Sequence, residues 1–112
     1  MIENLIIYQK TYESLKYAYV ALKQFPKSEK FSLASDIRES YYKLIRLIIE
    51  ANRKTKKLTD LYALDTELVF LKSIVHLSFE MKFIDVKKYE VLSKQLVEIG
   101  KILGGWIKSS KV

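Results

Sequence analysis

Apolar residues recur along the whole chain in four ladders that alternate steps of three and four residues. This spacing places the members of each ladder along one side of an α-helix. Four stripes of similar length can bury one another only as a helical bundle. The four expected ladders are Leu5, Tyr8, Tyr12, Leu15, Tyr19 and Leu22; Ala34, Ile37, Tyr41, Leu44, Ile48 and Ala51; Leu61, Leu64, Leu68, Leu71, Val75 and Ser78; and Tyr89, Leu92, Leu96, Ile99, Leu103 and Trp106.

The first two helices are separated by Pro26, which is the only proline in the chain. Because proline disfavours helical geometry in the residue before it, the first helix is predicted over residues 2–24. The second is predicted to begin between residues 27 and 32, with Ser28 or Ser32 as its cap, and to continue to residue 57.

The last two helices have acidic start signals. Thr59 with Asp60 predicts the beginning of a third helix that reaches about residue 82, and Asp85 is expected to cap the fourth. The connections are only a few residues long, so consecutive helices must be antiparallel. The sequence therefore predicts one all-α domain over residues 1–112, an up-down-up-down antiparallel four-helix bundle.

Composition limits the environment in which such a bundle works. The chain has no cysteine, so neither a disulfide framework nor a cysteine zinc site is expected. Charged residues interrupt every apolar run well before the roughly 20 residues that a membrane span requires. The N-terminal segment has no signal-peptide pattern, and a soluble cytoplasmic protein is expected.

The net charge of +7 favours partners with negative charge, such as nucleic acid. The excess is uneven, because residues 25–57 carry +5 and residues 84–112 carry +3, whereas residues 58–83 carry −2. In the fourth helix, lysines seven residues apart form a stripe roughly 32 Å long, enough to follow a phosphate backbone. The residues predicted to bind nucleic acid are Lys87, Lys94, Lys101, Lys108, Arg46, Arg53, Lys54, Lys56 and Lys57. The alternative is ordinary solvated surface, where lysine is common.

The first and third helices carry apolar residues on the sides remote from their ladders. Exposed apolar stripes of this kind usually mark an interface. In an up-and-down bundle these two helices are diagonal, so their patches face opposite directions and favour a heterologous contact that closes into a ring. Deeper burial inside a monomer is the alternative. The predicted interface residues are Ile6, Ile7, Val20, Tyr62, Val69, Phe70 and Leu77, and Ala21 also faces outward in this arrangement.

Catalytic constellations are missing from the sequence. A di-iron bundle would need a Glu-x-x-His pattern on two helices, but the chain has one histidine, His76, with Ser73 at the glutamate position. A helical ribonuclease of the HEPN type would need an arginine five or seven residues before the histidine, where Leu71 and Val69 stand. We therefore expect no enzyme activity, no metal and no cofactor.

Two further features lie in the fourth helix. Gly100 and Gly104 form a smooth ridge beside the ladder, and each costs about 1 kcal/mol relative to alanine inside a helix. Close approach by a neighbouring helix would compensate for this cost. Trp106 completes the ladder, so it is expected to close one end of the core rather than to stack on bases.

Three segments resemble the Avd family, the accessory variability determinants of diversity-generating retroelements. They are the junction Phe25–Phe31 followed by Leu33 and Ile37-Arg38, the end of the second helix at Leu47–Asn52, and the Glu98–Trp106 segment with its Gly-Gly-Trp ending. Related ribosomal-RNA intervening-sequence proteins share the Pro-Lys-x-Glu-Lys junction but usually have glycine where this chain has Asn52.

The resemblance implies a bacterial or phage-encoded four-helix bundle that assembles as a homopentameric barrel. Such a protein is not a catalyst. It binds the reverse transcriptase of the element and, with that enzyme, engages template RNA or cDNA during mutagenic reverse transcription. The alternative is an oligomeric bundle of the intervening-sequence type, with a protein-binding role and no nucleic-acid function.

Overall fold

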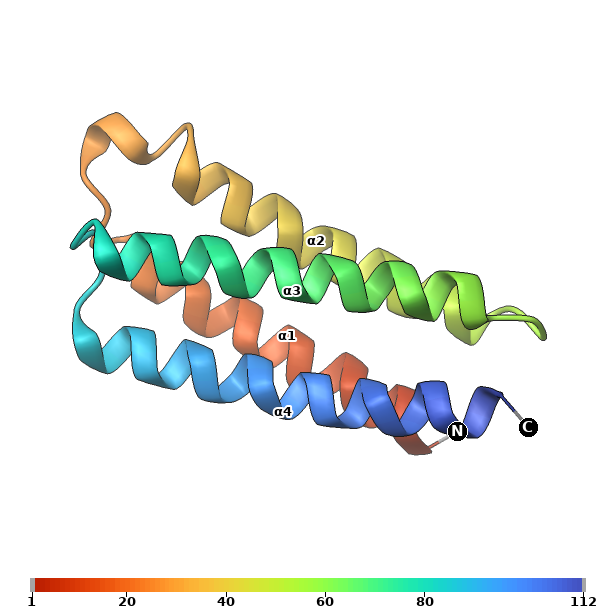
Figure 1. Cartoon of the computed structure of the whole chain (residues 1–112). Coiled ribbons are helices and arrows are strands. Elements are labelled where there is room, and N and C mark those ends of the chain that lie inside the picture. The colour runs from red at the N-terminus through yellow and green to blue at the C-terminus, as the bar shows by residue number, and fades with distance from the viewer. Residues whose placement is uncertain (1, 112) are drawn as a thin grey trace.

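The computed structural model describes residues 2–111, with side chains from residue 6 onward. Four long helices follow one another as α1 (Ile2–Leu22), α2 (Leu33–Asn52), α3 (Leu58–Glu80) and α4 (Val86–Ser110), and a short 3-10 helix, η1 (Lys27–Glu29), lies between α1 and α2. They form an elongated antiparallel bundle measuring 46 × 23 × 19 Å (Figure 1). The predicted four-helix architecture is confirmed.

The helices are arranged in a square in which sequence neighbours are also neighbours in space. α1 packs against α2 and α4, and α3 packs against the same two helices, while no close backbone contact joins either diagonal pair within residues 2–111. The start of α1 and the end of α4 lie at the same end of the bundle, opposite η1 and the α3–α4 turn (Figure 1). The diagonal placement of α1 and α3 agrees with the prediction.

The predicted ladders of α2, α3 and α4 form most of the core. All six ladder residues of α2 and all six of α3 are buried, as are five of the six in α4, with Tyr89 partly buried. Each buried leucine or isoleucine removes enough apolar surface from water to contribute about 1.5–3 kcal/mol. These stripes are the main source of stability for the bundle.

The predicted ladder of α1 is wrong at its three tyrosines, whereas Leu22 is buried and Leu15 is partly buried against the core, as predicted. Tyr12 is 48% exposed and Tyr8 and Tyr19 are similarly exposed, whereas Ile7 and Ala21, expected on the outside, are fully buried. The first rung, Leu5, lies outside the residues whose side chains are described. The buried side of α1 consists of Ile7, Thr11, Ser14, Ala18, Ala21 and Leu22, with Phe25 just beyond the helix.

A buried hydrogen-bond network explains why α1 turns this side inward. Ser14 Oγ donates to Gln95 Oε1 of α4 at 2.8 Å and lies 2.7 Å from the hydroxyl of Tyr41 of α2. Because the single Ser14 proton is used by Gln95, the Tyr41 hydroxyl donates to Ser14. Burial raises the pKa of Tyr41, opposed by this hydrogen bond, so the phenol stays neutral. Turning the α1 tyrosines inward would leave these polar groups without partners.

Two helix boundaries differ from the predicted ones. α2 ends at Asn52 rather than residue 57, and five residues, four of them cationic, form the connection to α3. α3 begins at Leu58, so Thr59 lies inside the helix and does not cap it. Ser32 holds the cap position of α2, but its hydroxyl donates to Glu29 instead of accepting from the helix backbone.

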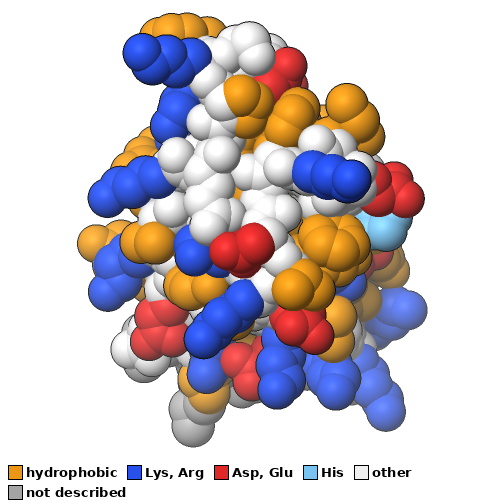
Figure 2. All heavy atoms as spheres, turned by 90° about the vertical axis from the view of Figure 1, so that its left-hand side faces the viewer, with side chains coloured by type: hydrophobic (Ala, Val, Ile, Leu, Met, Phe, Trp, Pro, Cys, Tyr) orange, Lys and Arg blue, Asp and Glu red, His pale blue; other side chains and the backbone are white. Residues whose placement is uncertain are grey.

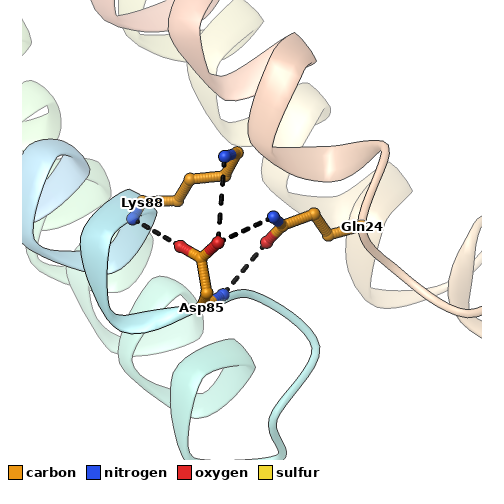
Figure 3. Close-up of polar contacts among 3 residues, drawn as sticks. All are labelled: Gln24, Asp85 and Lys88. Carbon is orange, nitrogen blue, oxygen red and sulfur yellow. Dashed lines mark hydrogen bonds and ion pairs between the residues drawn. The ribbon is translucent and has the colours of Figure 1, made fainter.

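The end of the bundle that carries η1 is tied together by Asp85. Its carboxylate accepts the backbone N–H of Lys88 at 2.8 Å and so caps α4, as predicted. The Gln24 amide, just after α1, donates to the same carboxylate at 2.9 Å and accepts the Asp85 backbone N–H at 3.0 Å (Figure 3). These hydrogen bonds, the one from Gln24 first, hold the pKa of Asp85 below its ordinary value. They fix where α4 begins relative to α1.

Candidate nucleic-acid and oligomer interfaces

The four α4 lysines at seven-residue spacing are all exposed. None of Lys87, Lys94, Lys101 and Lys108 forms an ion pair with a side chain of residues 6–111. Lys94 and Lys101 border a shallow hollow of about 410 Å³, whose single carboxylate, Glu98, lies 3.2 Å from Lys10 of α1. The ammonium donors of the α4 lysines are therefore available to a ligand.

The cations predicted for the second helix are more dispersed than expected. Arg46 is exposed on α2, but Arg53, Lys54, Lys56 and Lys57 follow the end of the helix instead of continuing its outer side. Lys54 Nζ lies 2.9 Å from Asp60, which raises the pKa of the lysine. Lys57 Nζ lies 5.7 Å from the centre of the Trp106 ring. Two of these cations thus already have partners within the subunit.

The structure separates Arg46 of α2 from the α4 lysines. α2 and α4 are diagonal in the bundle, so Arg46 and the α4 lysines occupy opposite flanks of one subunit. A single strand following the α4 lysines cannot reach Arg46 on the same subunit without crossing α1 or α3. Other Lys and Arg side chains gather around the end with η1 and the α3–α4 turn, with Asp and Glu side chains among them (Figure 2).

The predicted apolar face of α3 is exposed. Val69 is 55% exposed and Phe70 is 48% exposed, and Tyr62 and Leu77 are exposed to a similar extent. On α1, Ile6 and Val20 are exposed as predicted. The expectation that Ile7 faces outward is wrong, because its side chain is part of the core. The outer side of α1 therefore has fewer exposed Ile and Val side chains than predicted.

Exposed tyrosines occupy much of the outer side of α1 instead. Tyr8 and Tyr12 stack with ring centres 6.3 Å apart, and Lys16 Nζ lies 5.6 Å from the Tyr12 ring. The hydroxyl of Tyr19 pairs with that of Tyr42 from α2, and this hydrogen bond raises the pKa of Tyr42. Sequence reasoning missed this surface because it counted tyrosine as apolar. The stripe of small residues at 11, 14, 18 and 21 was the signal that could have found it.

Four further residues of α3 and α4, namely Trp106, Gly100, Gly104 and His76, differ in their surroundings. Trp106 is 2% exposed and closes the core, as expected. A side chain at Gly100 would lie 3.5 Å from Leu68 and from Lys72, whereas Gly104 faces open space in the subunit. A distance of 3.5 Å is an ordinary van der Waals contact, and both neighbours of Gly100 are side-chain ends, so the close approach expected for the two glycines is found at neither within the subunit. His76 is exposed and contacts the Tyr89 hydroxyl and Glu80.

The described part of the chain lacks two other kinds of site. No group of three or more His, Asp or Glu side chains is placed to hold a metal ion there. No helix in that range has both the length and the apolar character needed to cross a membrane. Its open hollows are lined by mixed polar and apolar side chains.

The fold and surface define a basic antiparallel four-helix bundle with one exposed apolar flank and an exposed lysine stripe. The chain belongs to the bAvd-like family, whose pattern matches residues 5–110. The fold is also similar to the crystal structure of a protein of unknown function from the S23 ribosomal protein family of Bacteroides thetaiotaomicron. That pair aligns with a TM-score of 0.84 at 20% identity, covering 95% of this chain and 98% of the other. A comparison with curated proteins finds no match.

Proposed function

We propose that this protein is a non-catalytic accessory subunit of a diversity-generating retroelement. In this role it binds the reverse transcriptase of the element and holds template RNA or cDNA during mutagenic cDNA synthesis. Membership of the bAvd-like family supports the accessory role. The observation that carries the nucleic-acid part is the α4 stripe of four exposed lysines, which form no ion pair among the side chains that the structure describes.

The α4 lysines fit a phosphate backbone in spacing and in chemistry. Lysine binds phosphate as a point charge, and neutralisation of phosphates releases condensed counterions. Contacts of this kind position a strand without reading its sequence. This suits a protein that accompanies an enzyme along a template, and it predicts affinity that falls steeply with salt.

The partnership with reverse transcriptase is tested by co-expression with the enzyme encoded beside the gene of this chain. We expect the two proteins to co-purify and cDNA synthesis to increase when this protein is present. The control is the same enzyme purified alone. If the protein binds RNA but neither co-purifies nor raises cDNA yield, the accessory role is contradicted. A folded oligomer that binds neither RNA nor the enzyme would favour the structural alternative of the intervening-sequence type.

We also propose that copies of the chain assemble into a ring, with five members by family resemblance. The exposed α3 face, containing Val69 and Phe70, would contact the opposite face of the next copy, on α1. That opposite face carries Tyr12 and Val20, both nearly half exposed. Contact between two different surfaces closes into a ring when the rotation between copies allows it.

Phe70→Asp is expected to convert the assembly into folded monomer. The side chain is 48% exposed, so an aspartate there is solvated in the monomer but would be desolvated in the interface. The measurement is molar mass by light scattering, with circular dichroism to confirm that the helices remain. Val86→Asp is the control, since Val86 is exposed in the first turn of α4, where an acid suits the helix dipole. A wild-type monomer at high concentration would contradict the ring.

A further inference from the structure

Three cations border an open, shallow pocket at the corner where α1, η1 and α2 meet. The pocket has a volume of about 320 Å³ and is lined by Tyr19, Leu22, Lys23, Lys30 and Arg38. No carboxylate lines it, and none of the three cations forms an ion pair within the part of the chain that the structure describes. Like charges held together repel each other, so this arrangement favours an anionic ligand.

Backbone contacts hold two of the three cations in place. Lys30 Nζ donates to the backbone carbonyl of Lys23 at 3.4 Å, and one Arg38 nitrogen donates to the carbonyl of Lys30 at 3.3 Å. Arg38 has five N–H donors and Lys30 has three, so both keep donors for a ligand. Lys23 keeps all of its donors, since its side chain has no hydrogen-bond or ion-pair partner in the described structure. Holding the donors in advance lowers the entropy cost of binding.

The tyrosine hydroxyls add a neutral donor at the rim. Tyr19 lines the pocket, and its hydroxyl pairs with that of Tyr42. One hydrogen bond between two hydroxyls uses one proton, so the second proton remains available to an acceptor. The hydrogen bond with Tyr19 raises the pKa of Tyr42, and the nearby positive charge of Arg38 partly opposes this rise. The ligand that fits is thus an anion with several acceptor oxygens.

We propose that this pocket binds a phosphate group, held by Lys23, Lys30 and Arg38. Arginine presents its donors as a fork that matches two phosphate oxygens. The phosphate can belong to a nucleic-acid strand or to a free phosphate compound. Phe31 favours the strand, because it directly follows Lys30 in the chain and is 94% exposed, which makes it available for stacking on a base. The α4 lysines are not part of this site.

The phosphate site is tested with pyrophosphate and with a short oligouridylate, by calorimetry at low salt. Lys23→Glu is the main variant, since its side chain supports no other group in the described fold. We expect it to weaken pyrophosphate binding about tenfold or more, as expected from loss of a charge-assisted contact. Lys94→Glu, with the same change in net charge, should alter that affinity less than about twofold. Equal losses in both variants, or no pyrophosphate binding by the wild type, would overturn the proposal.

Phe31→Ala separates the two sources of phosphate. If a strand is the ligand, this change should weaken oligouridylate binding about fivefold or more and leave pyrophosphate binding unchanged, because only a base can stack on the ring. If Phe31→Ala changes neither affinity while Lys23→Glu still weakens pyrophosphate binding, the site serves a free phosphate compound. Reversal of the α4 lysines leaves pyrophosphate binding intact in either case, so failure of the proposed retroelement role can be recognised separately.

Discussion

Ile7→Ala is expected to lower the free energy of unfolding by about 2–5 kcal/mol, the range for truncating a fully buried aliphatic side chain. Ile7 is 0% exposed and belongs to the core of α1. The loss includes the transfer free energy of the deleted atoms and the cavity that they leave. Tyr12→Ala is the matched comparison on the same helix. Its side chain is 48% exposed, so a loss below about 1 kcal/mol is expected.

The pair is measured by urea unfolding followed by circular dichroism. Both substitutions are placed in the Phe70→Asp background, so that subunit association does not contribute to the measured free energy. The ladder read from the sequence predicts the reverse order, because it places Tyr12 inside and Ile7 outside. A larger loss for Tyr12→Ala than for Ile7→Ala would contradict the orientation of α1 described above.

Reversal of the four α4 lysines to glutamate is expected to reduce RNA affinity about a thousandfold at about 50 mM salt. Each single-strand phosphate contact contributes about 0.7 to the slope of log affinity against log salt, so four lost contacts lower that slope by about 3. Fluorescence anisotropy with labelled RNA over a salt series measures both quantities. The variant should remain folded, because all four side chains are exposed.

The control carries the same change in net charge on the opposite flank. It reverses Arg46, Arg53, Lys54 and Lys56, which belong to α2 and the connection after it. We expect this control to lose less than about tenfold in affinity, since Lys54 is paired with Asp60 and the four do not form one line. If the α4 variant binds RNA as tightly as the control does, the α4 stripe is not the binding surface.

Some predicted interface residues are exposed as expected and one is buried, and each result has a physical reason. The exposure of Val69 and Phe70 follows directly from helical spacing, because the opposite side of α3 is a complete buried ladder, four of whose six residues are leucine. Ile7 was misplaced since residues on both sides of α1 are apolar or aromatic. The phosphate pocket could not be found from the sequence. Lys23 and Arg38 are fifteen residues apart and meet only because α1 and α2 fold back on each other at η1.

The amino-acid sequence alone determined the number of helices, their antiparallel order and the inward sides of α2, α3 and α4. Those sides are long ladders of mostly apolar residues, and burial of their apolar area favours this orientation over any other. The tertiary structure decided the orientation of α1, where small and polar residues such as Ser14 face inward. Hydrogen bonds from Tyr41 and to Gln95 settle that choice, and such partners on other helices cannot be read from local spacing.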